Sequence, residues 1–121
     1  MWGPRLRSRR HTAVAWYDVC SRTEVPPDGG RPVDVGGRPI AVFDDRGVLR
    51  AVDNVCRHLG SPLDGGWVER GCVTCPFHGW RYDLATGEVV TLFGRSRGLR
   101  TYRVRVAGGR VLVEVTDEED G

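Results

Sequence analysis

Two stretches rich in Cys, His, Gly and Pro dominate the sequence: Cys56-Arg57-His58-Leu59-Gly60-Ser61-Pro62-Leu63 and Cys75-Pro76-Phe77-His78-Gly79-Trp80. Each stretch offers one thiol and one imidazole, spaced as Cys-x-His in the first and as Cys-x-x-His in the second. Neither stretch has the periodic apolar pattern of a helix or a strand, so both are predicted to be loops. Long ordered loops in small domains usually carry function, and thiols and imidazoles are metal ligands. The two loops are therefore candidates for a shared metal site.

The ligand pattern favours a 2Fe–2S cluster held by both loops. If the loops face each other, Cys56 and Cys75 supply two sulfurs to one iron. His58 and His78 then supply two nitrogens to the other iron. This unequal set of two Cys and two His ligands occurs in one class of 2Fe–2S centre. The sequence therefore predicts one such cluster with these four residues as its ligands.

Three other interpretations of the four residues are open. Two Cys and two His also suit a tetrahedral structural zinc ion, although zinc fingers usually group two cysteines in one loop and two histidines in the other. Cys56 and Cys75 could form a disulfide, which a cytoplasmic setting disfavours. The four side chains could also bind no metal. We expect the iron–sulfur cluster, with zinc as the next alternative.

Both loops resemble the cluster-binding loops of Rieske ferredoxins and of Rieske oxygenase domains. The resemblance extends to the turn at 83–87 and to the last two strands, expected within 102–115, and it covers about 16–115 in all. It implies the Rieske iron–sulfur fold, an all-β antiparallel sandwich with a small cluster-binding subdomain of two loops. It also implies a set of residues that surround the cluster. These residues are Leu59, Gly60, Ser61, Pro76, Phe77, Gly79, Trp80 and Tyr82.

The rest of the sequence predicts an all-β domain of short strands joined by Gly-rich turns. Apolar and polar residues alternate most clearly at 102–106 and 111–115, on either side of Gly108-Gly109, and no convincing helix is found. The other expected strands are 13–19, 32–35, 39–43, 48–52, 67–69, 72–74, 81–84 and 88–91. We expect one domain over 13–116, with the cluster-binding insertion at about 53–91. A flexible basic leader at 1–12 and an acidic tail at 117–121 would flank it.

Differences from the high-potential Rieske proteins imply a low reduction potential. Members of respiratory and photosynthetic complexes carry an extra cysteine in each loop, joined as a disulfide, where this chain has Ser61 and Phe77. They also place a serine hydroxyl where this chain has Trp80, whereas Tyr82 keeps one hydroxyl donor. Hydrogen bonds to the cluster sulfurs favour the reduced state. The resemblance thus implies a potential in the lower part of the range of ~−150 to +300 mV.

Three histidines are too few for a complete Rieske oxygenase. Such an enzyme activates oxygen at a separate mononuclear iron, held by two histidines and a carboxylate. Once His58 and His78 are assigned to the cluster, only His11 is left, and it lies in the basic leader. We therefore expect the chain to transfer electrons and not to be catalytic on its own.

The composition is that of a globular domain, and it indicates neither a nucleic-acid partner nor a membrane-spanning segment. The 121 residues carry a net charge of +2, and all eighteen basic residues are arginines, a balance that argues against a nucleic-acid partner. No stretch reaches the ~20 apolar residues of a membrane helix. We expect a soluble, cytoplasmic protein in which Cys20 and Cys72 are packed thiols with no metal.

A small electron carrier is the function that these observations favour. It would accept one electron from a reductase and deliver it to a terminal component, an oxygenase by resemblance. Arg95 and Arg97 could dock an acidic partner protein, with a merely solvated strand face as the alternative. The alternative functions are a Rieske-like small subunit of a nitrite-reductase-type complex and a zinc-stabilised binding module.

Overall fold

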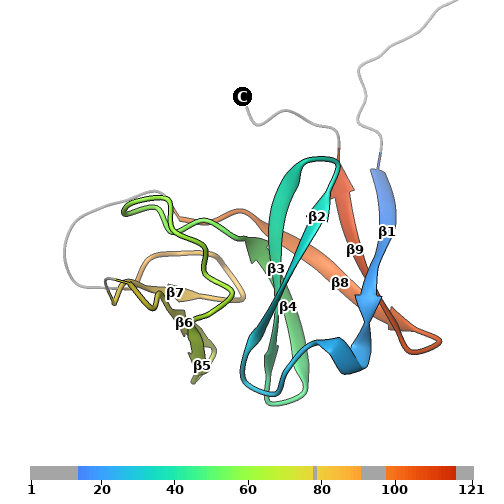
Figure 1. Ribbon diagram of the computed structural model, residues 1–121, viewed down its shortest axis with the longest axis horizontal. Coiled ribbons are helices and arrows are strands. Elements are labelled where there is room, and N and C mark those ends of the chain that lie inside the picture. Colours follow the sequence, from blue (N-terminus) through green and yellow to red (C-terminus); the bar gives the residue numbers. More distant parts are fainter. Residues whose placement is uncertain (1–13, 78, 91–97, 117–121) are drawn as a thin grey trace, which may run out of the picture.

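The computed structural model describes residues 14–77, 79–90 and 98–116, and these residues form the all-β domain that the sequence predicts (Figure 1). The expected leader and tail lie outside them. The described elements are β1 (Val14–Ser21), a 3₁₀ helix (Arg22–Glu24), β2 (Gly30–Val35), β3 (Arg38–Asp45), β4 (Val48–Asp53), β5 (Trp67–Glu69), β6 (Cys72–Thr74), β7 (Arg81–Asp83), β8 (Thr101–Ala107) and β9 (Arg110–Thr116). None of the helical segments among these residues has the length and apolarity needed to cross a bilayer.

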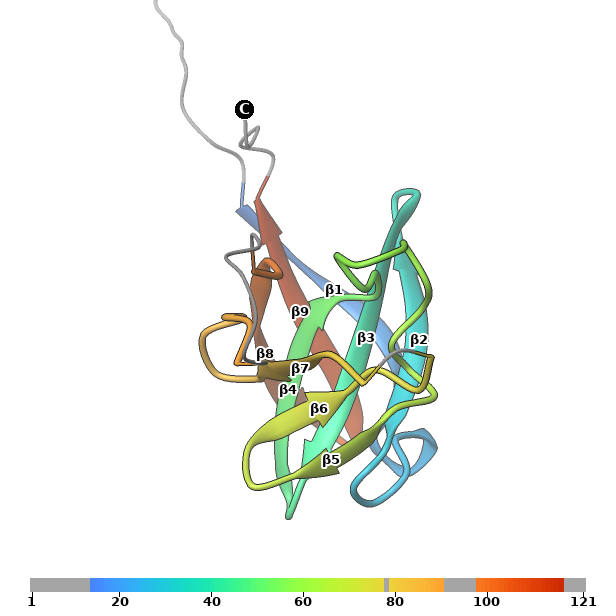
Figure 2. The same ribbon diagram turned by 90° about the vertical axis from the view of Figure 1, so that its left-hand side faces the viewer.

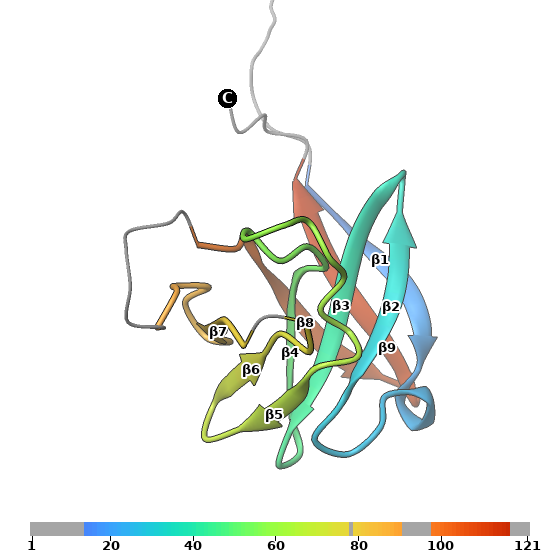
Figure 3. The ribbon, with the colours of Figure 1, turned by 60° about the vertical axis from the view of Figure 1, so that its left-hand side comes forward.

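Six strands form one antiparallel sheet in the order β1-β9-β8-β4-β3-β2. Two of its hairpins turn on the glycine pairs Gly36-Gly37 and Gly108-Gly109, whose φ angles are all positive, between 58° and 86°. Positive φ at both central positions is typical of a type I′ hairpin turn, and glycine adopts it without steric cost. The sheet curls until its two edge strands, β1 and β2, come into contact, so that it encloses a core (Figures 2 and 3).

The core inside this curled sheet is built from one face of each strand. In β9, for example, Val111, Val113 and Val115 are buried while the residues between them are at least partly exposed. Burial raises the pKa of the Cys20 thiol in this core, so Cys20 stays protonated and unreactive. The buried set is Cys20, Val25, Val35, Ile40, Val42, Ala51, Tyr102, Val111, Val113 and Val115.

Strand β3 is buried on both of its faces. Ile40 and Val42 point into the first core, whereas Ala41 and Phe43 point into a second core on the opposite face of the sheet. All four side chains are fully buried. A strand covered on both faces needs apolar residues at successive positions, which accounts for the uninterrupted apolar run at 40–43. β3 therefore joins the two cores, together with β4, whose Ala51 lies in the first core and whose Val52 lies in the second.

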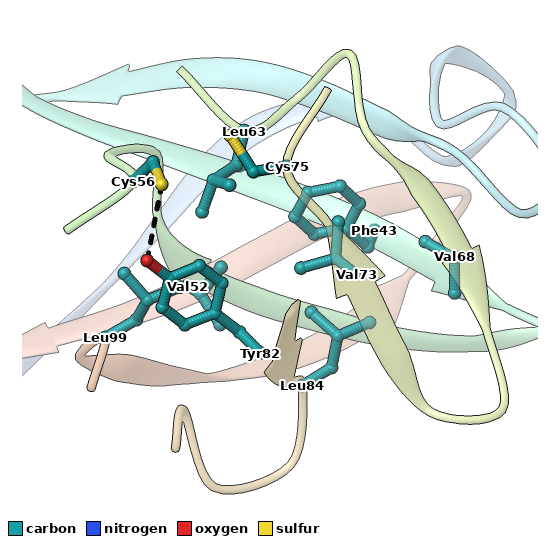
Figure 4. Packing of buried hydrophobic residues seen from close by; sticks show 11 residues of the cluster. Phe43, Val52, Cys56, Leu63, Val68, Val73, Cys75, Tyr82, Leu84 and Leu99 are labelled. Carbon is teal, nitrogen blue, oxygen red and sulfur yellow. Dashed lines mark hydrogen bonds between the residues drawn. The ribbon is translucent and has the colours of Figure 1, made fainter. Parts of the chain in front are cut away.

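The second core lies between the large sheet and a small three-stranded sheet with the order β5-β6-β7. Each small strand contributes one buried residue to it, and both cysteines of the two expected ligand loops belong to it (Figure 4). Its members are Ala41, Phe43, Val52, Cys56, Leu63, Val68, Val73, Cys75, Tyr82, Leu84 and Leu99. Because three-residue strands have little stability of their own, the small sheet depends on this packing against β3 and β4.

The short 3₁₀ helix was not expected from the sequence. It is held by a capping box, in which the Ser21 hydroxyl accepts the Thr23 N–H at 3.3 Å and the Glu24 carboxylate accepts the Ser21 N–H at 2.8 Å. Three residues are too few to produce a periodic apolar pattern. The apolar periodicity from which longer helices are predicted is therefore absent from this segment.

The segment expected to be a strand at 88–91 forms a single antiparallel bridge, between Val89 and Tyr82, and residue 91 lies outside the described residues. The Asp83 carboxylate accepts the N–H groups of Ala85 and Thr86 and so caps the turn that follows β7. Beyond this turn, the Asp83 N–H donates to the Glu88 carbonyl and the Val90 N–H donates to the Arg81 carbonyl, both at 2.9 Å. The segment is therefore a short hairpin arm of β7, with too few paired residues to count as a strand.

Gly87 ends this turn where it meets the chain that enters β8, and its substitution tests that contact. Gly87 has a φ of +81°, and a Cβ atom there would overlap the carbonyl oxygen of Leu99. We expect Gly87→Ala to lower the free energy of unfolding by about 2–4 kcal/mol, as measured by urea denaturation. Gly109→Ala is the matched control, because Gly109 has a φ of +78° but no atom within 4 Å of its added Cβ. It should lose only about 1–2 kcal/mol, and equal losses would contradict the close contact.

Candidate metal centre

The first expected ligand loop follows β4 and closes on itself through two main-chain hydrogen bonds. The Cys56 N–H donates to the Ser61 carbonyl at 2.7 Å, and the Gly60 N–H donates to the Cys56 carbonyl at 2.7 Å. Gly60 has a φ of +79°, a conformation that glycine adopts readily. The loop therefore has a defined backbone frame that begins at its cysteine.

The second loop follows β6 and repeats the same frame. The Cys75 N–H donates to the Trp80 carbonyl at 2.7 Å, and the Gly79 N–H donates to the Cys75 carbonyl at 3.1 Å. Gly79 has a φ of +76°. In each loop the cysteine is thus bonded to the residues four and five positions later, and the fourth is a glycine with positive φ. The two cysteines consequently occupy equivalent positions in two turns of the same kind.

Both cysteines are buried members of the second core (Figure 4). Cys56 is 1% exposed and Cys75 is 0% exposed, and no disulfide joins any of the four cysteines. The alternative of a Cys56–Cys75 disulfide is therefore not what the structure shows. Two buried, unbridged cysteines in neighbouring loops form a sulfur donor set that suits a soft metal centre such as an iron–sulfur cluster or zinc.

Tyr82 connects the second core to the first loop. Its side chain is fully buried, and its hydroxyl lies 3.4 Å from Cys56 Sγ and accepts the Arg57 N–H at 2.8 Å. Burial, and then the hydrogen bond with Cys56, raise the pKa of Tyr82 well above its ordinary value. The phenol is therefore neutral. With its oxygen accepting from Arg57, its own proton can be donated toward the sulfur of Cys56.

The imidazole of His58 lies at the surface, in contrast to the buried thiols. Its ring stacks on the indole of Trp80, with 4.8 Å between the ring centroids and 10° between the planes. His78, the fourth expected ligand, lies outside the described residues. Among the residues that are described, no three His, Cys, Asp or Glu side chains lie close enough together to hold a metal ion. The described residues thus include three of the four expected ligands: Cys56, His58 and Cys75.

Most of the residues expected around the cluster lie at the loop surfaces. Leu59 is 66% exposed and Phe77 is 58% exposed, although both are large apolar side chains, and Pro76 is also exposed. Ser61 is half-buried. The loops therefore present apolar tips to solvent while they keep their cysteines inside.

Arg95 and Arg97, the two residues expected to dock a partner protein, lie outside the described residues. Of their neighbours on β8, Arg103 lies 3.8 Å from the carboxylate of Glu114, and Arg105 lies 4.4 Å from the ring centre of Trp16. These two arginines thus interact with the outer face of the large sheet.

Asn54 is a residue of the site that the sequence did not reveal. It is 9% exposed, and its side-chain oxygen accepts the N–H groups of Leu63 at 2.6 Å and Asp64 at 2.9 Å. Its amide group donates to the Asp64 carboxylate at 3.0 Å. Asn54 therefore ties together the two ends of the first loop. Its partners are nine and ten residues away, a distance that no local capping pattern predicts.

Removal of this side chain should loosen the first loop. Asn54→Ala leaves two poorly solvated backbone N–H groups without an acceptor, at a cost of about 1–3 kcal/mol each in the free energy of unfolding. We expect both a lower unfolding midpoint in urea and a lower iron content of the purified protein. Asp34→Ala is the control, because Asp34 makes a similar bond to Gly37 N–H at 2.8 Å in an exposed turn of the large sheet. It should change the iron content little, and an unchanged iron content in Asn54→Ala would contradict the assigned role.

Residues 15–103 match the family model of the Rieske [2Fe-2S] domain. Among curated proteins, the ferredoxin component of a naphthalene 1,2-dioxygenase system from Pseudomonas aeruginosa is 29% identical, over 84% of this chain and 96% of the relative. The anthranilate 1,2-dioxygenase ferredoxin subunit of Burkholderia cepacia is 33% identical, over 86% of this chain and 95% of the relative. The aminopyrrolnitrin oxygenase PrnD of Pseudomonas fluorescens is 37% identical over 90% of this chain, which corresponds to only 30% of that enzyme.

Solved structures agree with this relationship. The ferredoxin of carbazole 1,9a-dioxygenase from Nocardioides aromaticivorans IC177 superposes with a TM-score of 0.74 and 29% identity, over 81% of this chain and 95% of that one. A chain from the complex of reduced oxygenase and oxidized ferredoxin in carbazole 1,9a-dioxygenase gives 0.72 and 29%, over 81% and 91%. The small subunit of a nitrite reductase gives 0.70 at 22% identity, over 82% and 97%, which shows the fold alone. By the match over 15–103, the relatives and the shared fold, the chain belongs to the Rieske [2Fe-2S] domain family.

Proposed function

We propose that this chain is a one-electron carrier that binds one 2Fe–2S cluster through Cys56, His58, Cys75 and His78. The observation that carries the proposal is the pair of loops with one backbone frame, each of which starts at a buried cysteine beside the same core. Family membership implies a 2Fe–2S cluster, and the two cysteines supply the sulfur half of the ligand set. The imidazoles, one of them described at the surface, would supply the nitrogen half.

When bound, the cluster supplies reversible one-electron chemistry. The chain's own residues set the conditions for that chemistry. Packing around Cys56 and Cys75 keeps water from both sulfurs, and the neutral hydroxyl of Tyr82 offers a hydrogen bond to the sulfur of Cys56. His58, in contrast, lies at the surface, where a partner protein can approach it. This arrangement separates a dry side of the centre from a side that exchanges electrons.

A low reduction potential is part of the proposal. Ser61 and Phe77 provide no disulfide between the loops, and Trp80 provides an indole ring where a hydroxyl donor would raise the potential. Among the described residues, Tyr82 is the side chain whose hydroxyl lies within hydrogen-bond distance of a ligand sulfur. The value would fall in the lower part of the range of ~−150 to +300 mV.

The proposed partners are a reductase that supplies the electron and a terminal oxygenase that receives it. Two relatives are named as ferredoxin components or subunits of dioxygenases, and one similar solved chain comes from a complex of an oxygenase with a ferredoxin. Three histidines leave this chain without a ligand set for the mononuclear iron of an oxygenase. The carrier would act in the cytoplasm, where cysteines stay reduced, in agreement with its four unbridged cysteines.

Metal content tests the cluster and its ligands. We expect about two irons per chain, a red-brown colour and a rhombic electron paramagnetic resonance (EPR) signal after reduction, since these mark a Rieske centre. His58→Ala and His78→Ala should each abolish the signal. Cys72→Ala is the matched control and should retain the cluster, because Cys72 lies in β6 outside the second core. A colourless protein with one zinc ion per chain would refute the proposed function and support a zinc-stabilised module.

Reversal of charge tests the proposed docking by Arg95 and Arg97. If these residues attract an acidic partner, the double variant Arg95→Glu/Arg97→Glu should slow electron transfer to the oxygenase about tenfold or more at low ionic strength. It should also flatten the dependence of the rate on salt. Arg31→Glu serves as the control, since Arg31 lies on β2 of the large sheet near Glu24. Stopped-flow rates that match the native protein at every salt concentration would count against docking at these residues.

A further inference from the structure

One aromatic contact joins the two ligand loops at their surface. The indole of Trp80, from the second loop, lies against the imidazole of His58, from the first. The rings are nearly parallel, and the centroid separation of 4.8 Å is that of an offset stack. His58 is exposed whereas Trp80 is half-buried, so the indole covers one face of an otherwise exposed imidazole.

The indole is itself held in place. The main chain of Trp80 closes the second loop, because its carbonyl accepts the Cys75 N–H at 2.7 Å. Its side chain packs against the second core, where its ring lies 6.5 Å from that of Tyr82 at a tilt of 40°. Trp80 therefore presents a fixed surface to His58.

The chain beside His58 is held by the same segment. Two residues after Trp80, the hydroxyl of Tyr82 accepts the N–H of Arg57, the residue that precedes His58. The three-residue segment 80–82 thus contacts the first loop twice. Tyr82 fixes the main chain next to the imidazole, and Trp80 fixes the ring.

The two loops carry different side chains at this position. Ser61 and Trp80 occupy equivalent positions, because each carbonyl accepts the N–H of the cysteine that opens its own loop. Ser61 has no ring, so the aromatic surface at this position is a feature of the second loop alone.

We propose that Trp80 is a positioning residue that sets the ring orientation of His58. This inference rests on the proposed function. Groups around a metal site orient its ligands, most often through a hydrogen bond to the second nitrogen of an imidazole. Here an indole face restricts the rotation of the ring. The geometry of one nitrogen ligand, that of His58, would therefore depend on Trp80.

Pulsed EPR of the reduced holoprotein, labelled with ¹⁵N-histidine, tests the proposal. The spectrum measures the coupling of the unpaired electron to each ligand nitrogen. In Trp80→Leu we expect one of the two couplings to change while the other keeps its native value. The loss of the cluster to an iron chelator should be about two- to tenfold faster, the factor that corresponds to one aromatic pair. Trp80→Phe keeps a smaller ring and should change the same coupling in the same direction by less.

Trp67→Leu is the matched control, because Trp67 is a 52% exposed tryptophan in β5, outside both ligand loops. It should leave both couplings native. The proposal is overturned if both couplings of the Trp80 variants are native, or if both shift together. Should Trp80→Leu hold no cluster, Trp80→Phe decides by the same criteria. A native protein without iron would refute the proposed function, whereas a native cluster that is insensitive to Trp80 would refute only this inference.

Discussion

The burial of β3 on both faces is the constraint on which the rest of the structure depends. Alternate residues of one strand fill two different cores, so neither core can be repacked without the other. Phe43 stands on the side of the small sheet, where strands of three residues could not persist unaided. The six-stranded sheet is therefore the support for a subdomain that is too small to fold alone, and that subdomain carries the two loops.

This support also explains why the two cysteines of the candidate site are buried whereas His58 is exposed. Each loop opens with its cysteine at the edge of the second core and closes two hydrogen bonds onto that same residue. The cysteine must point inward, and the chain that follows it must turn outward. His58, Leu59 and Phe77 are consequently exposed, while Cys56 and Cys75 are dry. The loop geometry alone thus explains why the cysteines are buried while the residues at the loop tips are exposed.

Much of the fold and of the site was predictable because the signals are local. The glycine pairs fix hairpins, the alternation in β9 fixes a buried face, and the Cys and His spacings define the loops. The remainder depends on contacts across the chain. Asn54 bonds to groups nine and ten residues away. Trp80, which the resemblance placed around the cluster in place of a hydroxyl donor, stacks on His58 from the other loop. The strand expected at 88–91 is reduced to one bridge between Val89 and Tyr82.

The burial of the ligand cysteines also bears on how the protein ages chemically. Oxidation of cysteine to sulfenic acid and beyond requires a reactive thiolate that an oxidant can reach. Cys56 and Cys75 are closed off by packed side chains, and Cys20 is buried in the first core with a raised pKa. Cys72, half-buried in β6, is the most accessible sulfur of the four. Peroxide in the surroundings would thus meet Cys72 first, whereas the two cysteines proposed to bind the cluster are shielded by the packing around them.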